Sequence, residues 1–151
     1  MICRADGKPN QAFISNLHEQ HPMKKNNIIY WAARLIAAVI MAQTLFFKFS
    51  GAEESVEIFT KMGMEPWGRI GTGVLELLAS VLLLINGIAR WGALLACGLM
   101  AGAIGSHLFV LGVEVRGDGG YLFTLAMIVL VASLYVLWVN REKFLALISK
   151  A

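Results

Sequence analysis

Ionisable side chains lie inside, or at the ends of, long apolar stretches of this 151-residue chain. Glu76 lies near the middle of one stretch, and His107 lies near the end of another. A charged group at membrane depth costs at least ~2.5–3.5 kcal/mol on insertion scales, so such groups are paired or functional. A carboxylate and an imidazole can exchange protons with a bound molecule. We therefore take Glu76 and His107 as candidate catalytic residues.

Two basic residues on an earlier apolar stretch could balance the charge of Glu76 or bind a ligand. Arg34 and Lys48 are two heptads apart, so on a helix they share one face, about 21 Å apart along the axis. Counting helical rises places Glu76 between them, with His107 and Lys48 around a pocket that opens on the outer side. Gln43 would add an amide at intermediate depth. A purely structural ion pair between Arg34 and Glu76 would explain the same residues, and both interpretations stay open.

The composition is that of a membrane protein: 58% of the residues are hydrophobic and 15% are charged, whereas soluble domains average ~45–50% and ~25%. About 20 apolar residues are needed for one helical span. The sequence therefore predicts an all-α integral membrane four-helix bundle with short loops. We expect a polar, flexible N-terminal tail over 1–27, one four-span domain over 28–140 and a basic tail over 141–151. The predicted spans are 28–47, 67–87, 91–111 and 121–139.

Local signals predict how these spans are connected and packed. The longest loop should hold a short interfacial helix at about 53–62, and Asp118 should cap the start of the last span. Gly98, Gly102 and Ser106 follow one another at steps of four on the third span. Small residues at that spacing allow two membrane helices to approach closely, so we expect helix packing there.

Other classes of site find no support in the sequence. A net charge of +3 gives no argument for nucleic acid, and two cysteines make no disulfide framework. The spacing of cysteine, histidine and carboxylate residues indicates no metal site, and no covalently bound cofactor is expected. Basic residues near the span ends predict that both termini are cytoplasmic.

Several short motifs occur in the order and spacing found in one known family. They are an Arg in the first span (Arg34), the segment FFKFSG at 46–51, a loop with Phe59, Gly63 and Pro66, the Gly73-x-x-Glu76 start of the second span, and a short turn ending in Arg90 before a helix rich in small residues. In this pattern the chain resembles the DoxX family of small four-helix bacterial membrane proteins, over residues 28 to about 140. Phe49 departs from the family's usual Leu.

The resemblance implies a function that the composition does not show. The family includes subunits of thiosulfate:quinone oxidoreductases, so we expect a bacterial inner-membrane protein that is part of, or accessory to, a redox system. Its polar pocket would bind a quinone or small reductant, with Arg34, Lys48 and Glu76 matching the family's polar positions. Partners would be the lipid bilayer and a redox protein or further copies of the chain. Alternatives are a non-catalytic scaffold or cargo-binding protein, and a small oligomeric transporter.

Overall fold

The computed structural model describes residues 24–141, and this part of the chain is helical, without strands. Four long helices and one short helix follow one another along the chain. They are α2 (Lys24–Ser50), the short α3 (Glu53–Lys61), α4 (Trp67–Leu84), α5 (Ala89–Ser106), continued by the π-helical segment η1 (His107–Leu111), and α6 (Tyr121–Val139). All four long elements are long and apolar enough to cross a membrane. The predicted all-α class with four spans is confirmed.

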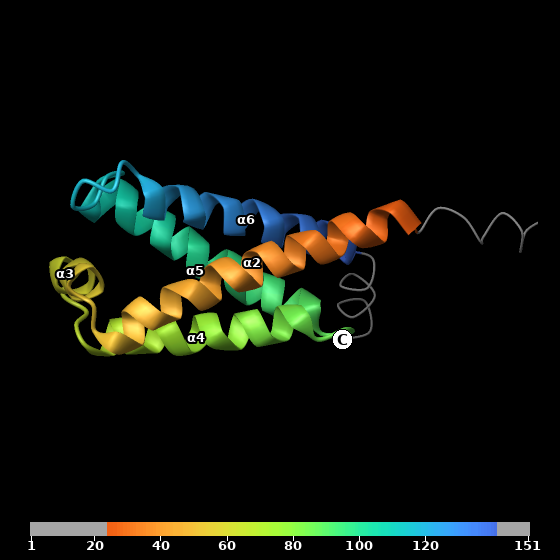
Figure 1. The fold of residues 1–151 in the computed structure, drawn as a ribbon, viewed down its shortest axis with the longest axis horizontal. Coiled ribbons are helices and arrows are strands. Elements are labelled where there is room, and N and C mark those ends of the chain that lie inside the picture. The colour runs from red at the N-terminus through yellow and green to blue at the C-terminus, as the bar shows by residue number, and fades with distance from the viewer. Residues whose placement is uncertain (1–23, 142–151) are drawn as a thin grey trace, which may run out of the picture.

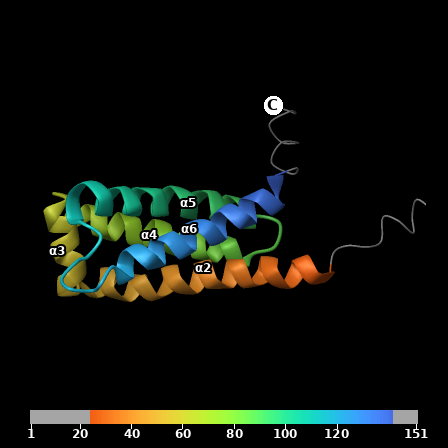
Figure 2. The ribbon, with the colours of Figure 1, turned by 90° about the horizontal axis from the view of Figure 1, so that it is seen from above.

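The long helices form a bundle in which α2 and α5 each pack against both α4 and α6 (Figures 1 and 2). The start of α2 and the end of α6 lie at the same end of the bundle (Figure 1). A hydrogen bond joins them there, from Asn140 Nδ2 to the hydroxyl oxygen of Tyr30 at 3.0 Å. At the opposite end, α3 contacts α2, α4 and η1.

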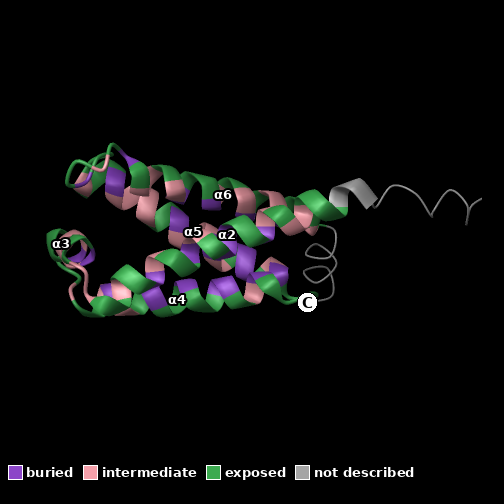
Figure 3. Cartoon of the chain, viewed as in Figure 1, coloured by how far each residue is buried: buried purple, intermediate pink, exposed green. Residues whose placement is uncertain are grey.

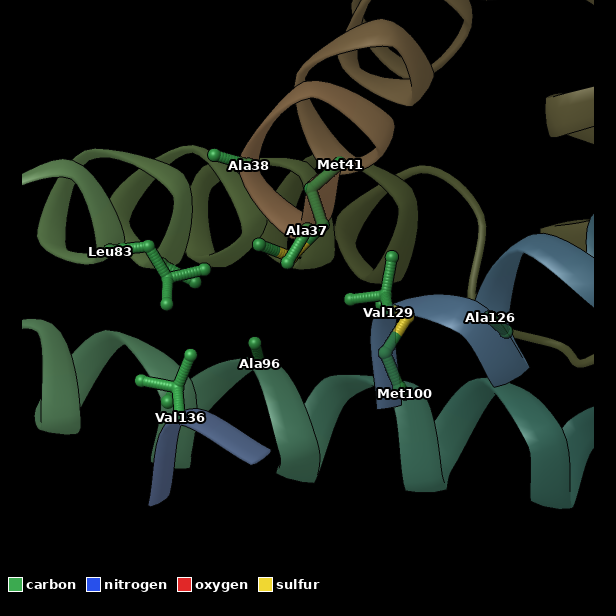
Figure 4. Close-up of a cluster of buried hydrophobic side chains, with 11 residues drawn as sticks. Ala37, Ala38, Met41, Leu83, Ala96, Met100, Ala126, Val129 and Val136 are labelled. Atoms are coloured by element: carbon green, nitrogen blue, oxygen red, sulfur yellow. The ribbon is translucent and has the colours of Figure 1, made fainter. Parts of the chain in front are cut away.

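Small and flexible side chains fill the centre of the bundle (Figure 4). The buried residues include Ala37, Met41, Leu83, Ala96 and Val129. Exposed residues cover much of the outside of the bundle (Figure 3), and many of them are large and apolar. Such extensive apolar exposure is rare on soluble monomers, whereas a bilayer solvates it.

Helices α4 and α5 are in close contact only near the turn that joins them. A Cβ atom added at Gly92 would lie 2.6 Å from the backbone nitrogen of Leu83. At Gly98 and Gly102, by contrast, an added Cβ would meet nothing within 4 Å. The two helices diverge toward the end where α3 lies (Figure 1). Within the described residues, the structure therefore shows no close approach of a second helix at Gly98 or Gly102, and α4 and α5 meet at Gly92 instead.

The ends of the chain leave two expectations unexamined. The predicted tails over 1–27 and 141–151 lie mostly outside the described residues. The helix predicted at about 53–62 is present as α3, with Phe59 buried and its first turn carrying two glutamates.

Candidate functional site

Glu76 forms an ion pair with Lys48 inside the bundle. The ammonium nitrogen of Lys48 lies 2.9 and 3.1 Å from the two carboxylate oxygens, and the Thr44 hydroxyl donates to one of them at 2.9 Å. The two charged side chains are only 15% and 8% exposed. Lys48 and Thr44 are four residues apart, so one face of α2 presents both donors to α4. Lys48 is therefore the counter-charge of Glu76 in this structure.

Arg34 does not share in this pair, so within the described residues the alternative ion pair between Arg34 and Glu76 is not formed. The Arg34 guanidinium donates to the carbonyl oxygen of Leu83 at 2.5 Å and to Asn86 Oδ1 at 3.0 Å. Leu83 is seven residues beyond Glu76 on α4, about 10 Å along the helix axis. The last carbonyls of a helix have no intrahelical donors and carry partial negative charge. The α4 terminus, rather than a carboxylate, is therefore the counter-charge of Arg34.

The surroundings of Arg34 enclose it completely. Its side chain is 1% exposed, and its guanidinium carbon lies 4.0 Å from the centroid of the Trp31 ring and 5.2 Å from that of Tyr30. A cation above an aromatic face is favourable, more so when water is excluded. Arg34 thus fastens α2 to the end of α4 and is a structural residue in this geometry.

Replacing Arg34 with Met should lower the free energy of unfolding by about 2 kcal/mol, because a charged donor and the partner of a buried carbonyl are lost together. Arg34→Lys should lose less, since it keeps the charge but not the second donor or the stacking. Thermal unfolding in detergent measures both. Ligand binding at the cavity described below should be unchanged in either variant, and loss of that binding would contradict the structural assignment.

A large cavity opens where the helices diverge, with a volume of about 1050 Å³. Its wall comes from all of the described helices and from the loop before α6. The polar residues that line it are Gln43, Thr44, Lys48, Glu54, Ser55, Thr72, Glu76, Ser106, His107, Asp118 and Tyr121. The remaining wall is made mostly of apolar side chains. Glu76, Lys48, His107 and Gln43, predicted as one constellation, therefore face the same cavity, and Arg34 does not.

His107 begins the π-helical segment and is 94% buried, since its exposed fraction is 6%. Its Nδ1 lies 2.9 Å from the carbonyl oxygen of Gly112. A carbonyl only accepts, so Nδ1 carries the proton. Nε2 has no hydrogen-bond partner within the part of the chain that the structure describes. Segments of π-helix are frequent at functional sites, and here the wider turn carries His107 on the cavity wall.

Gln43 and Tyr121 connect the two sides of the cavity. The Gln43 amide nitrogen lies 3.5 Å from the Tyr121 hydroxyl oxygen, a long contact between α2 and α6. The hydroxyl proton of Tyr121 and the amide oxygen of Gln43 have no described partner. Both remain able to bind a polar group in the cavity.

Asp118 organises the loop beside His107. Its carboxylate accepts hydrogen bonds from the backbone N–H groups of Val115, Gly120 and Leu122 at 2.9–3.0 Å. Leu122 is in the first turn of α6, so the predicted capping role is confirmed. Partial burial raises the pKa of Asp118, but these N–H donors and the nearby His107 outweigh it and hold the pKa below its ordinary value.

A pH dependence follows from this lowered pKa. The Asp118 carboxylate should stabilise the loop fully at pH above its ordinary pKa, and the contribution should fade as the pH falls through the lower folded-state value. Asp118→Ala should remove it and cost about 1 kcal/mol, the usual size of a helix cap. Hydrogen exchange of the Leu122 amide, followed against pH, measures the effect. Equal protection in the two proteins at neutral pH would contradict it.

Salt bridges join the elements at the end of the bundle where α3 lies. Arg116, in the loop before α6, reaches Glu57 at 3.3 Å and Glu53 at 3.7 Å on α3. At the start of α4, Arg69 binds Glu65 at 2.7 Å and also donates to the backbone carbonyl of Lys48. The Arg116 pairs are exposed and contribute little stability. Arg69 is buried and holds the end of α2 that carries Lys48.

The sequence reasoning missed Thr44, Tyr121 and Arg69 as parts of this site. Thr44 had a usable signal, because it is the residue one helical turn before Lys48 in an apolar span. Tyr121 and Arg69 lie at span ends, where aromatic and basic residues are common for reasons of lipid contact alone. Among the described residues, no group of three or more His, Cys, Asp or Glu side chains could hold a metal ion.

Comparisons with known proteins identify the family. No curated protein and no solved structure matches the chain. The DoxX family matches residues 29–111, which is more than half of the chain and extends from α2 to the end of η1. The ion pair, Arg34 and His107 all lie within this region, whereas Asp118 and α6 lie beyond it. The chain is therefore a multi-pass membrane protein that belongs to the DoxX family.

Proposed function

We propose that this DoxX protein binds a quinone, or a small reductant of similar polarity, in the cavity between its helices and serves a membrane redox system. The observation that carries the proposal is the cavity itself. An apolar space of about 1050 Å³ joins the buried Lys48–Glu76 pair to the buried His107. Ligand sites in proteins are typically cavities of this size with apolar walls and a few convergent polar groups.

The polar groups of the cavity suit a quinone head. A quinone has carbonyl oxygens that accept hydrogen bonds, and the Tyr121 hydroxyl has a free proton for such a bond. A quinol has hydroxyl donors, for which the Nε2 of His107 is an acceptor. Reduction of a quinone takes two electrons and two protons. The electrons would come from a redox partner protein and the protons from water, relayed through Glu76 and His107, which would each accept a proton, at a carboxylate oxygen and at Nε2, before donating it to the quinone.

A quinone analogue tests this proposal by direct titration. We expect saturable binding to the purified protein in nanodiscs, with weaker binding in His107→Leu and Tyr121→Phe. Ile36→Leu is a matched control, because Ile36 faces the groove between α2 and α6 rather than this cavity. Absence of saturable binding, or equal binding in all variants, would refute the quinone site.

One observation favours a non-catalytic scaffold as the second candidate. Both oxygens of Glu76 accept hydrogen bonds from Lys48, and the pair connects α2 to α4, as a purely structural pair would. In that case Glu76→Gln should lower thermal stability and leave association with partner proteins unchanged. The transporter alternative has lost its main support, because Arg34 is sealed at the inner end and does not line the cavity.

We also propose that the protein lies in the bacterial inner membrane with both termini in the cytoplasm. The basic residues near the span ends support this orientation. The described ends of α2 and α6 lie at the same end of the bundle, as any four-span arrangement requires (Figure 2). Labelling of intact cells with a thiol reagent that cannot cross the membrane would test it in the variants Glu54→Cys, on α3, and Asn27→Cys. We expect only Glu54→Cys to react. Reaction of Asn27→Cys instead would show the opposite orientation.

A further inference from the structure

We infer that the cavity opens sideways to the bilayer between α4 and α5, and that it takes an uncharged amphiphile whose apolar tail lies along α5 over Gly98 and Gly102. This inference rests on the proposed function and specifies the ligand of that same site. It adds an access route, a place for the tail and a selection by charge.

The cavity follows one face of α5 over almost its full length. Its lining residues on that helix include Trp91, Leu95, Gly98, Gly102 and Ser106, which recur at steps of three and four. From Trp91 to His107 the helix rises about 24 Å. The space is therefore long enough to hold the apolar tail of a ligand as well as a compact head group.

The cavity lining continues from the buried face of α5 around to an exposed row. Met100 lines the cavity and belongs to the buried row of Ala89, Ala93 and Ala96. The second row is formed by the exposed lining residues around Gly98 and Gly102. Gly92, which contacts α4, lies between the two rows on the helical wheel. The exposed row thus lies on the lipid side of the α4 contact. The two helices diverge beyond Gly92 (Figure 1), and the cavity lining there includes the exposed residues Gly98 and Gly102 of α5, so we place the opening to the bilayer on this side.

The polar and apolar parts of the cavity lie at different depths. Glu76 is the innermost charged residue of the lining, and the part of α5 nearest the inner turn contributes Trp91, Leu94 and Leu95. Polar groups from η1, the loop before α6 and the end of α2 surround the outer half. Burial of a tail against the inner part is favourable at about 25 cal/mol per Å² of apolar surface. The head would then lie in the outer half, beside His107 and Tyr121.

The charges of the lining favour an uncharged head. Three carboxylates line the cavity, from Glu54, Glu76 and Asp118, against the single cation of Lys48. Lys48 is already bound to Glu76, and Asp118 accepts three backbone N–H groups. No cation is left among the lining residues for a phosphate or a fatty-acid carboxylate. Such heads would meet net negative charge, whereas a quinone or an alcohol head would not.

Glycines at two positions make a matched test possible. Gly102 lines the cavity, and a Cβ atom added there would meet nothing within 4 Å; the same holds for a Cβ atom at Gly105, which does not line the cavity. Both changes replace a helical glycine with a better helix former, so both variants should fold. We expect Gly102→Leu to weaken binding of a long-tailed quinone about tenfold, which is 1.4 kcal/mol. Gly105→Leu should bind like the native protein.

A series of quinone analogues, from tail-less to decyl, separates the tail from the head. Affinity should rise with tail length in the native protein and in Gly105→Leu, and much less in Gly102→Leu. Gly98→Val is a second variant, in which affinity should also rise much less with tail length than in the native protein. If the tail-less analogue binds as tightly as the decyl analogue, the tail position is wrong while the proposed function stands. If decanol binds at this site and no quinone does, the proposed quinone function is refuted, while the inferred site for the apolar tail along α5 stands.

Competition measures the selection by charge. Decanol should displace the decyl quinone, and decanoate at neutral pH should not. Displacement by decanoate at the same concentration would overturn the exclusion of anionic heads. Native mass spectrometry of the protein extracted from membranes gives an independent readout. An anionic lipid that co-purifies with the native protein and is lost in Gly102→Leu would also overturn the exclusion of anionic heads.

Discussion

Lys48→Met is expected to lower the free energy of unfolding by about 3–5 kcal/mol, the usual cost of leaving one half of a buried ion pair without its partner. The Glu76 carboxylate would keep one hydrogen bond, from Thr44, and lose both contacts to the ammonium group. Its side chain is only 8% exposed, so water replaces the lost partner poorly. Thermal unfolding in nanodiscs or detergent measures the change.

The double variant Lys48→Met/Glu76→Leu is the control for this prediction. Replacing a buried ion pair by apolar residues of similar volume is often neutral or stabilising, so most of the lost stability should return. Glu76→Gln should fall between the native protein and Lys48→Met. Additive losses in the double variant would show that the two side chains do not act as a pair.

Gly92→Val is expected to cost at least ~3 kcal/mol, at the upper end of what overpacking a tight contact costs. Its Cβ would meet the backbone nitrogen of Leu83 at 2.6 Å and the carbonyl oxygen of Ala79 at 2.9 Å. Backbone atoms of α4 cannot turn aside as a flexible side chain can. The variant should therefore separate α4 from α5 or fail to accumulate as folded protein, which unfolding curves and expression levels would show.

Gly98→Ala provides the contrast on the same helix. An added methyl group there meets nothing within 4 Å, and alanine favours a helix over glycine by up to ~1 kcal/mol. We expect native or slightly raised stability. A loss as large as that of Gly92→Val would mean that Gly98 packs against another helix after all, for example in an oligomer.

Apolar length and composition were sufficient to predict the four spans, because each helix must satisfy its backbone within the membrane. That Glu76 needs a cation was also predictable, since a buried carboxylate requires a partner, but the sequence left both Arg34 and Lys48 open as that partner. Arg34 could not be placed in this way. Its partners are a backbone carbonyl and an amide at the end of α4, and these carry no charge in the sequence.

The glycines show a second limit of sequence reasoning. Gly98 and Gly102 repeat at the spacing of a packing motif, yet the helix that would pack on them diverges. Gly92 is outside that glycine repeat and is the position where α4 and α5 meet. Close approach depends on where the crossing point of two helices falls, which in this protein is fixed by the short turn at 85–88. Spacing along one helix does not contain that information.

Photo-crosslinking with an azido-quinone, followed by peptide mapping, tests the central claim that the cavity holds the ligand. The account predicts labelling of the cavity face, at Thr44–Lys48 on α2 and around Gly102–His107 on α5 and η1. Excess unlabelled decyl quinone should remove this labelling. Labelling confined to the lipid-facing groove at Ile29–Ile36 and Met127–Val131, or labelling that excess quinone does not reduce, would contradict it.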